Sequence, residues 1–284
     1  KTADYVAGQV TSPGYGSIGG DWAVLGLARG GANVKSGYFD GYYAKLESYV
    51  KSCQGVLHKR RYTDYSRVVL AVTAIGKDAR DVAGYNLLLP LGDFEKTVYQ
   101  GVNGAIFALL ALDAGGYEIP ANPEAKTQAT RDGYVQKILS AQLADGGWNM
   151  SGEKADADLT AMALQALAGY TAQAAVQEAV DRGIAALSSM QLTDGGFATG
   201  GAETCESNAQ VIVAMAELGI SPSDSRFTKG SSTVVDALLA FSNTNGSFCH
   251  TMGGEANEMA TEQALYALAA LQQAANGKTL YKMV

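Results

Sequence analysis

The chain has 284 residues, of which 47% are hydrophobic, and its 28 acidic side chains outnumber 21 Lys and Arg, which gives a formal net charge of −7. This balance offers no basic surface for a nucleic-acid backbone, so nucleic acid is not an expected partner. No stretch of about 18 apolar residues occurs, and the sequence therefore predicts no transmembrane segment in this chain. Lys1 begins the chain without an initiator Met, which indicates a fragment of a longer protein.

Cysteine and histidine are scarce. The three cysteines, Cys53, Cys205 and Cys249, leave at least one thiol unpaired, so no disulfide framework is predicted and their redox state stays open. The two histidines, His58 and His250, are too few for a histidine-rich metal site. A metal ion would therefore have to use carboxylates.

In chain order, three apolar segments in the first half have the pattern of buried helices. They cover residues 19–27, 65–72 and 103–110, and each has polar or aromatic residues near its start. The boundaries are least defined over 79–98, where Asn86 to Pro90 could form a helix stopped by proline or a loop.

The second half contains a repeated turn. Asp145-Gly-Gly-Trp148 returns as Asp194-Gly-Gly-Phe197 and, in altered form, as Asn245-Gly-Ser-Phe248, with starts 49 and 51 residues apart. A period near 50 residues is typical of repeat proteins, in which each unit buries its apolar face against its neighbours. Because no strand precedes the glycine pairs, they are predicted to be structural turns and not phosphate-binding loops.

A helix apolar on nearly every side follows each turn, at 155–167, 206–218 and 258–271, and such helices must be buried all round. Segments 131–143, 172–189 and 232–241 instead have one apolar face. This alternation predicts an all-α fold with two concentric layers. The expected architecture is an α/α toroid, a double-ring α6/α6-type barrel that forms a single domain over 1–284.

The repeats resemble those of the terpenoid cyclase and protein prenyltransferase superfamily. Gln142-Leu-Ala-Asp145-Gly-Gly-Trp148 and Gln191-Leu-Thr-Asp194-Gly-Gly-Phe197 come close to the family's Gln-x-x-x-Asp-Gly-Gly-aromatic repeat, over about 130–284. The first half is more similar to prenyltransferase and squalene oxidase-repeat domains of secreted surface proteins of Gram-positive bacteria. The resemblance implies an extracellular or cell-surface location and a multidomain parent whose other domains are partners. Cobalamin carriers with a similar barrel make a corrinoid one candidate ligand.

Asp156-Ala-Asp158-Leu-Thr160-Ala161 resembles the Asp-x-Asp-Asp-Thr-Ala motif of class II triterpene cyclases. The resemblance places Asp158 at the position of the proton donor, whereas Leu159 replaces the third Asp. In the alternative reading, Asp156 or Asp158 caps the helix, because carboxylates accept the free N–H groups at a helix start.

Glu203-Thr-Cys205-Glu-Ser207 resembles the prenyltransferase segment that supplies two zinc ligands, but Ala260 stands where the resemblance expects a histidine. Two ligands do not make a zinc site, so no zinc is expected and Cys205 is predicted to be buried. Carboxylates could in principle bind calcium, but they lack EF-hand spacing. They are Asp156, Asp158, Glu203, Glu206, Glu258 and Glu262. No metal residues are therefore assigned.

Polar and aromatic side chains recur in the first turns of the six predicted inner helices. They are Trp22, Tyr65, Arg67, Asn103, Asp156, Asp158, Glu206, Asn208, Gln210, Thr261, Glu262 and Gln263. If the inner helices are parallel, these residues surround one mouth of the barrel and line its main pocket, with contributions from at least four repeats. The alternative is that they only cap and solvate helix ends.

Because both catalytic motifs are incomplete, we expect a domain that is not an enzyme. It would bind a small molecule or a glycan in the central cavity, at the amino-terminal ends of the inner helices. Two alternatives remain. The chain could be an enzyme, terpene cyclase-like or glycan lyase-like, with Asp158 or Glu206 as the acid, or it could be a structural or adhesion module whose mouth is filled by side chains. The sequence does not identify the ligand or the oligomeric state.

Overall fold

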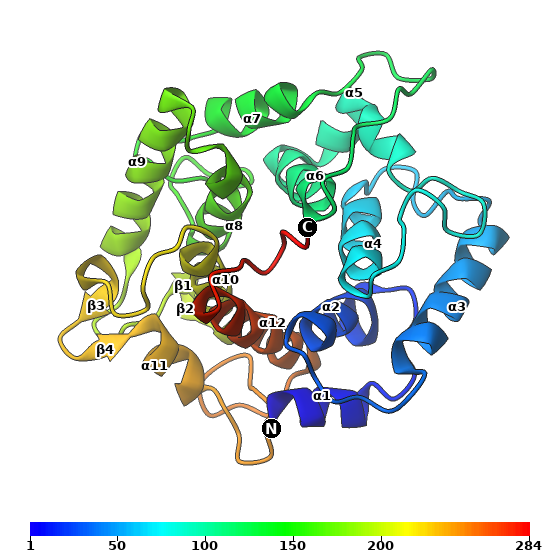
Figure 1. The fold of residues 1–284 in the computed structure, drawn as a ribbon. Coiled ribbons are helices and arrows are strands. Elements are labelled where there is room, and N and C mark those ends of the chain that lie inside the picture. Colours follow the sequence, from blue (N-terminus) through cyan, green and yellow to red (C-terminus); the bar gives the residue numbers. More distant parts are fainter.

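A computed structural model describes residues 1–284 and is almost entirely helical. Six inner helices surround one axis (Figure 1). They are α2 (Trp22–Arg29), α4 (Thr63–Ala74), α6 (Val102–Ala114), α8 (Ala157–Leu167), α10 (Cys205–Glu217) and α12 (Glu258–Ala275). Consecutive members contact each other and α12 contacts α2, so the inner ring is closed. The predicted α/α toroid is confirmed.

An outer ring of helices covers the inner one. It consists of α1 (Thr2–Gln9), α3 (Tyr38–Ser52), the short α5 (Phe94–Thr97), α7 (Arg131–Ser140), α9 (Ala174–Met190) and α11 (Val234–Ala240). The segments predicted as amphipathic became α7, α9 and α11. Helices α1 and α3 were not predicted. Pro90 does not end a helix; it lies in the first turn of the 3-10 helix Leu89–Gly92, which leads into α5.

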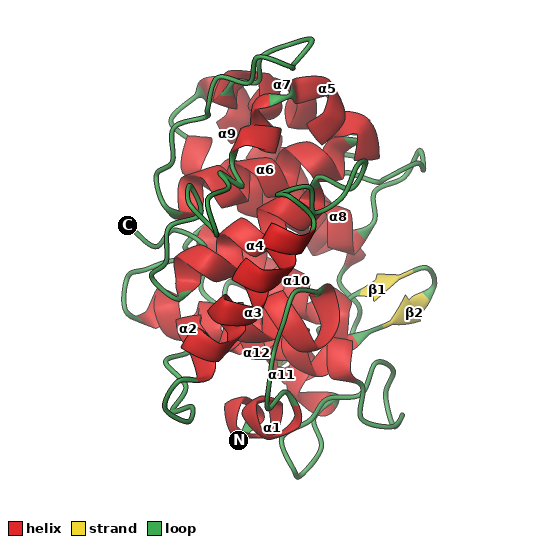
Figure 2. Cartoon of the chain, turned by 90° about the vertical axis from the view of Figure 1, so that its right-hand side faces the viewer, coloured by secondary structure: helices red, strands yellow, loops and turns green.

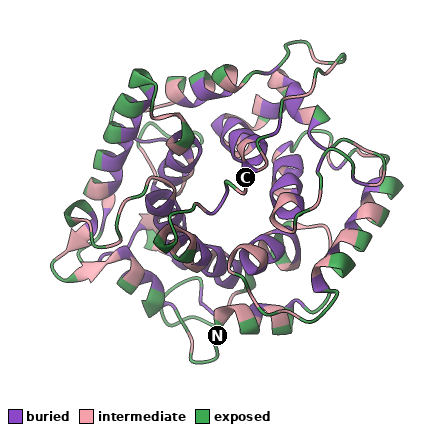
Figure 3. Cartoon of the chain, in the orientation of Figure 1, coloured by how far each residue is buried: buried purple, intermediate pink, exposed green.

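Burial follows the two rings (Figure 3). Ten of the 13 residues of α6 are buried, and α8 and α10 are buried to a similar extent. The outer helix α9, by contrast, buries one stripe that includes Val176, Val180 and Leu187. Apolar surface is thus removed from water on all sides of the inner helices and on one side of the outer ones, as the sequence pattern predicted.

The three glycine turns have the same backbone geometry. Gly146, Gly195 and Gly246 have φ values of 93°, 91° and 96°, in the left-handed region that favours glycine. A Cβ atom at each position would lie 2.7 to 2.8 Å from the backbone of the next outer segment. Those backbone positions are Arg182, Thr233 and Lys1. The altered third turn, at Gly246, therefore packs against Lys1 at the start of the first outer helix, α1. The prediction that these loops are structural is confirmed.

Each turn is also held by the inner helix that follows it. The N–H group of the aromatic residue donates a hydrogen bond to a polar side chain at the fourth position of that helix. The pairs are Trp148 with Thr160 Oγ1 at 2.9 Å, Phe197 with Asn208 Oδ1 at 2.7 Å, and Phe248 with Thr261 Oγ1 at 2.9 Å. Because all three aromatic rings are buried, these bonds satisfy backbone groups that water cannot reach.

A carboxyl-terminal tail closes one end of the barrel. After α12, residues 276–284 cross the axis at the carboxyl-terminal ends of the inner helices (Figure 1). Leu280 and Tyr281 are buried, and their N–H groups donate to the Glu217 carboxylate. Arg29 donates to the carbonyl oxygens of Thr279 and Leu280 at 2.8 Å. The open mouth is therefore at the amino-terminal ends.

Two short hairpins complete the fold. The hairpin of β1 (Ala198–Thr199) and β2 (Ala202–Glu203) lies at the end of the barrel opposite the tail (Figure 2). The second hairpin pairs β3 (Thr228–Lys229) with β4 (Ser232–Thr233) just before α11. None of the helices has the length and apolar character needed to cross a membrane.

Candidate functional site

The inner helices expose side chains to the axis only near their starts, and we call this end the central mouth. Four inner helices carry a pair of partly exposed residues four positions apart in the first two turns. The pairs are Thr63 with Arg67, Asn103 with Phe107, Asp158 with Met162, and Met259 with Gln263. Residues four apart lie on one helix face, and in α4, α6 and α8 the other residues of these two turns are buried. The central mouth is thus reached by solvent.

Aromatic rings form the floor of the central mouth. The Trp22 ring lies 6.0 Å from the Phe107 ring and 5.7 Å from the Tyr266 ring, between ring centroids. These residues come from α2, α6 and α12, so the rings meet across the axis. The centre of the barrel is therefore packed, and the mouth is shallow.

Side-chain amides cross the wall below the rim. The Gln165 amide donates to the backbone and side-chain oxygens of Gln210 at 3.0 Å. Gln210 in turn donates to Gln263 at 2.9 Å and to the Tyr266 hydroxyl. This network joins α8, α10 and α12, and it places two of the predicted binding residues, Gln210 and Gln263, on the wall of the central mouth.

Two carboxylates occupy the same position, the second residue, of α8 and α10. Asp158 is partly exposed and accepts a hydrogen bond from Thr199 in the β1–β2 hairpin at 3.0 Å. Glu206 is 6% exposed and its Oε2 lies 2.8 Å from Nδ1 of His250. The His250 side chain is 49% exposed. A buried carboxylate is therefore coupled to an imidazole that water can reach.

Asp156, and not Asp158, caps α8. Its Oδ1 accepts the Leu159 N–H at 2.7 Å, and burial raises the pKa of its carboxyl. The reading of Asp156 as a cap is thus correct, and this bond occupies one of its two carboxylate oxygens. Asp158 points instead to Thr199, so the cap interpretation fails for that residue.

Three further residues predicted to bind a ligand have structural partners. The side chains of Asn208 and Thr261 accept the backbone N–H groups of Phe197 and Phe248. A buried N–H group needs such an acceptor, so these two side chains are explained by the turns they hold. Glu262 faces the gap between α12, α1 and α2, where it accepts the Gly19 N–H at 2.8 Å. Burial raises its pKa to about 7.

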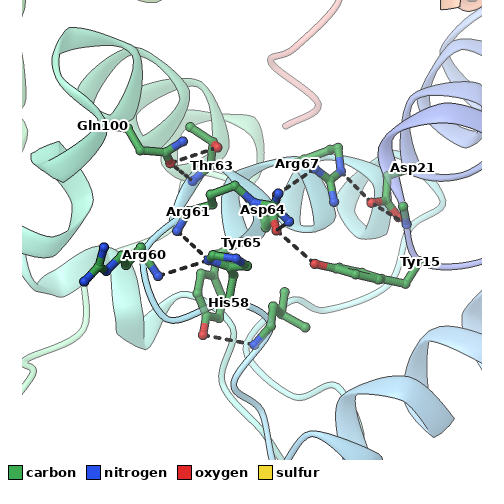
Figure 4. Close-up of polar contacts among 12 residues, drawn as sticks. Tyr15, Asp21, His58, Arg60, Arg61, Thr63, Asp64, Tyr65, Arg67 and Gln100 are labelled. Carbon is green, nitrogen blue, oxygen red and sulfur yellow. Dashed lines mark hydrogen bonds and ion pairs between the residues drawn. The ribbon is translucent and has the colours of Figure 1, made fainter.

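Arg67 lies at the rim in a buried ion-pair network (Figure 4). Its guanidinium contacts Asp21 at 2.7 Å and Asp64 at 2.9 Å. The hydroxyls of Tyr42 and Tyr15 donate to the same two carboxylates, at 2.7 and 3.1 Å. Burial raises the pKa of Asp21, which is fully buried, and Arg67 opposes that rise. Arg67 therefore joins α2 to α4 and has little freedom to bind a ligand.

Four buried oxygen atoms on the inner helices have no hydrogen-bond partner. They are Ser66 Oγ, Asn103 Oδ1, Gln165 Oε1 and Glu206 Oε1, on α4, α6, α8 and α10. A buried polar group without a partner costs roughly 1–3 kcal/mol.

The main pocket is not at the central mouth. A pocket of about 770 Å³ opens on the outside of the ring and includes Tyr65, which the sequence analysis placed at the rim. The expectation that the rim opens into the main pocket is therefore wrong, because Trp22, Phe107 and Tyr266 fill the barrel centre. Of the predicted residues, the structure brings together Trp22, Asn103, Asp158, Glu206, Gln210 and Gln263, with Arg67 beside them.

No group of three or more His, Cys, Asp or Glu side chains is placed to hold a metal ion. Cys205 is buried and its Sγ lies 3.6 Å from the Ala260 carbonyl oxygen, while burial raises the pKa of the thiol. Glu203 accepts from the Asn208 amide at 3.1 Å. The three cysteines are free, and Cys205 is the small buried residue that was predicted.

A family model confirms the fold assignment. The model of the prenyltransferase alpha-alpha toroid domain matches residues 90–283. The chain belongs to this family. No curated protein matches this toroid significantly.

Several solved structures share the toroid fold. The type II terpene cyclase MstE from Scytonema is 13% identical with a TM-score of 0.56, over 90% of this chain and 87% of that chain. The ent-copalyl diphosphate synthase from Streptomyces platensis is 19% identical with a TM-score of 0.54, over 90% and 50%. An unsaturated glucuronyl hydrolase from Bacillus sp. GL1, responsible for the degradation of glycosaminoglycan, is 12% identical with a TM-score of 0.60, over 93% and 88%.

The expectation that this toroid is not an enzyme is corrected by these matches. Its solved structural relatives include terpene cyclases and a glucuronyl hydrolase. Incomplete cyclase and zinc motifs do not exclude catalysis in a fold that supports several chemistries.

Sequence reasoning missed four residues of the site and its surroundings. Asp21 and Asp64 hold Arg67, His250 contacts Glu206, and Phe107 completes the aromatic floor. Phe107 follows Asn103 by four residues, so the helical period could have placed it beside Asn103. His250 lies in the loop between α11 and α12, and no sequence pattern connects it to Glu206.

Proposed function

We propose that this toroid is an enzyme that cleaves a glycosidic bond in a sugar substrate bound at the central mouth. The observation that carries the proposal is the Glu206–His250 pair on α10, with a second carboxylate, Asp158, at the same position of the neighbouring helix α8. Cleavage of glycosidic bonds commonly uses two carboxyl groups, one of which supplies a proton to the leaving oxygen.

The chemistry assigns a role to each group. The Glu206–His250 pair holds a proton between the two side chains, and His250 exchanges it with solvent because half of its surface is exposed. Transfer of this proton to the glycosidic oxygen breaks the bond to the anomeric carbon. Water then adds to that carbon, and Asp158 accepts the proton that water releases.

The walls of the mouth favour a hydroxyl-rich substrate. The side-chain amides of Asn103 and Gln263, both partly exposed in the first two turns of their helices, can bond to sugar hydroxyls. Trp22 and Phe107 offer flat apolar surfaces for the carbon face of a sugar ring. A shallow mouth suits the end of a sugar chain. The glucuronyl hydrolase match adds support, although its identity is 12%.

The test is cleavage of an oligosaccharide panel, including unsaturated glucuronyl disaccharides, followed by mass spectrometry. Glu206→Gln and Asp158→Asn should each lower the rate at least ~100-fold, the usual range for loss of a general acid or base. Glu178→Gln, an exposed carboxylate on α9, is the matched control and should leave the rate unchanged. The proposal fails if no oligosaccharide is cleaved, or if both rim variants retain the parent rate.

A second candidate function is a terpene cyclase-like protonation by Asp158. It is favoured by the Asp156-x-Asp158-x-Thr160-Ala161 segment and by the aromatic floor, since aromatic faces stabilise cations. It is opposed by Leu159, which is buried in place of the third acid. Cyclic products from geranylgeranyl substrates that disappear in Asp158→Asn would favour this function over glycan cleavage.

An extracellular or cell-surface location, within a multidomain parent from a Gram-positive bacterium, stays a prediction. Protease treatment of intact cells would test it, because a surface protein is cleaved under conditions that spare internal ones.

A further inference from the structure

The main pocket of the toroid is a groove on the outside of the ring. It lies between the α3–α4 loop, residues 84–90 and residues 122–124, and has a volume of about 770 Å³. We call it the Tyr62–Tyr85 groove. Nothing in the proposed cleavage uses this groove.

Tyrosine rings give the groove flat walls. Tyr62 packs against Tyr65 with a centroid distance of 5.2 Å, and the Tyr65 hydroxyl accepts the Leu57 N–H at 3.1 Å. Tyr85 covers Gly55 so closely that a Cβ there would lie 2.5 Å from the ring. Tyr62 and Tyr65 are 9% and 3% exposed and support the groove from below, whereas the partly exposed Tyr85 ring presents an apolar face with a polar edge that suits a sugar ring. Side-chain amides of Gln54, Asn86 and Asn122 line the same groove.

The charge of the groove differs from that of the whole chain. His58, Lys59 and Lys96 line it against one carboxylate, Glu124, although the net charge of the chain is −7. Lys96 forms an ion pair with Asp93, with 3.3 Å between Nζ and Oδ2, whereas Lys59 is exposed and forms no ion pair. His58 Nδ1 accepts the Arg60 and Arg61 N–H groups at 3.0 and 2.8 Å, which leaves Nε2 to face outward.

A basic run connects the groove to the central mouth. Residues 58–61 read His-Lys-Arg-Arg and end directly before α4, whose Thr63 and Arg67 belong to the rim (Figure 4). Arg60 lies over the Tyr99 ring at 5.6 Å, and Arg61 contacts Asp64 at 3.3 Å with 60% of its side chain exposed. Positive charge thus continues from the groove towards the rim.

We infer that the Tyr62–Tyr85 groove binds an acidic oligosaccharide, one that carries carboxylate or sulfate groups. A sugar ring stacks on Tyr85, and the anionic groups pair with Lys59, Lys96 and the 58–61 run. The inference rests on the proposed function. The groove holds most of the sugar chain while one end of the chain enters the central mouth for cleavage. Long sugar chains would then be bound more tightly than disaccharides.

The experiment is calorimetric binding to hexasaccharides of galacturonate and chondroitin sulfate, with maltohexaose as the neutral counterpart. Using the Glu206→Gln protein prevents cleavage during the measurement. We expect acidic hexamers to bind at least ~10-fold more tightly than maltohexaose at low salt, and the difference should shrink as salt rises.

Two substitutions of opposite sign sharpen the test. Lys59→Gln should weaken binding of the acidic hexamers several-fold, and Glu124→Gln should strengthen it, because each removes one charge from the groove wall. Tyr85→Ala should weaken binding of both kinds of hexamer. Lys137→Gln, at a partly exposed lysine on α7 outside the groove, is the control and should leave binding unchanged.

The outcomes separate the groove from the catalytic proposal. Acidic hexamers that bind no better than maltohexaose, or that bind the Lys59 and Glu124 variants with parent affinity, would overturn the inference even if sugars are cleaved at the mouth. Charge-dependent binding in the groove without cleavage of any oligosaccharide would support the groove as a binding site and would instead reject the proposed enzyme.

Discussion

The two halves of the ring are held together by different interactions. In residues 130–284, each repeat uses a glycine turn whose aromatic N–H is bonded to the next inner helix. In residues 1–129, the turns are irregular, and a buried ion-pair network around Arg67 joins α2 to α4. Each turn satisfies its buried N–H group within its own repeat. The ion-pair network, by contrast, is stable only if Arg67, Asp21 and Asp64 are all present. The comparison teaches that neighbouring hairpins of one toroid can be joined either by backbone bonds within a repeated turn or by buried charges.

The largest expected effect concerns the ion-pair network. Arg67→Met would leave the fully buried Asp21 without its cation, and we expect a loss of about 3–5 kcal/mol in the free energy of unfolding. Arg61→Met is the matched control, because Arg61 contacts Asp64 while 60% exposed, and it should cost less than about 1 kcal/mol. Urea denaturation measures both. Equal losses would mean that the first half does not depend on the network.

The second prediction concerns the glycine turns. Gly195→Ala forces a side chain into a left-handed residue and against the Thr233 backbone 2.7 Å away, and should cost about 1–3 kcal/mol plus any displacement of α11. Gly200→Ala has a φ of 66° but open space around it, so it should cost only about 1 kcal/mol. If thermal and urea unfolding show no difference between them, the close approach does not hold the repeats together.

The third prediction concerns pH and the tail that spans the two halves. Burial raises the pKa of Glu217 from 4.5 to about 7, while its hydrogen bonds to Leu280 and Tyr281 oppose the rise. The folded state therefore binds more protons than the unfolded state between these values. This contribution to stability is complete below pH 4.5 and is lost as pH rises through about 7, with a size of roughly 1–3 kcal/mol.

Glu217→Gln should flatten the fall in stability between pH 4.5 and 7, measured by urea unfolding at several pH values. Part of the slope should remain, because the pKa of Glu262 is also raised to about 7. Glu178→Gln, which is exposed, should not change the slope. A pH profile identical in Glu217→Gln and the parent protein would contradict the prediction.

The smallest effect separates stability from function within α8. Asp156→Ala removes the cap and should cost about 1 kcal/mol. Asp158→Ala loses a partly exposed bond to Thr199 and a favourable position near the helix dipole, and should cost about 0.5 kcal/mol. Cleavage of oligosaccharides should respond in the opposite order. A larger stability loss in Asp158→Ala would return Asp158 to a structural role.

The inner helices could be predicted from the sequence because they are apolar on nearly every side, a pattern with few alternatives. Helix α3 was missed because its buried face is built from Tyr38 and Tyr42 together with Leu46 and Val50, so polar and apolar residues mix along it. Tertiary hydrogen bonds to Asp21 and to the Val10 carbonyl make those tyrosines suitable for the interior.

The site was predicted less completely, for a physical reason. Polar residues at the helix starts look alike in sequence, whether they face the mouth or a backbone N–H. Asn208 and Gln210 differ by two positions, yet Asn208 holds a turn and Gln210 joins the amide network, because two residues rotate the side chain to another side of the helix. The pairing of Glu206 with His250 depends on the path of a loop, which no periodicity specifies.

The contact between Gly246 and Lys1 also bears on how the molecule unfolds. In an open solenoid, terminal units have one neighbour and melt first, so intermediates with frayed ends are populated. Here α12 packs on α2 and α1, so every repeat has neighbours on both sides. A ring has no end from which melting could begin. We therefore expect the ring to unfold in one concerted step. The closed ring forms only after residues such as Gly19 and Glu262, 243 positions apart, have met, so folding is expected to be slow relative to helical bundles with local contacts.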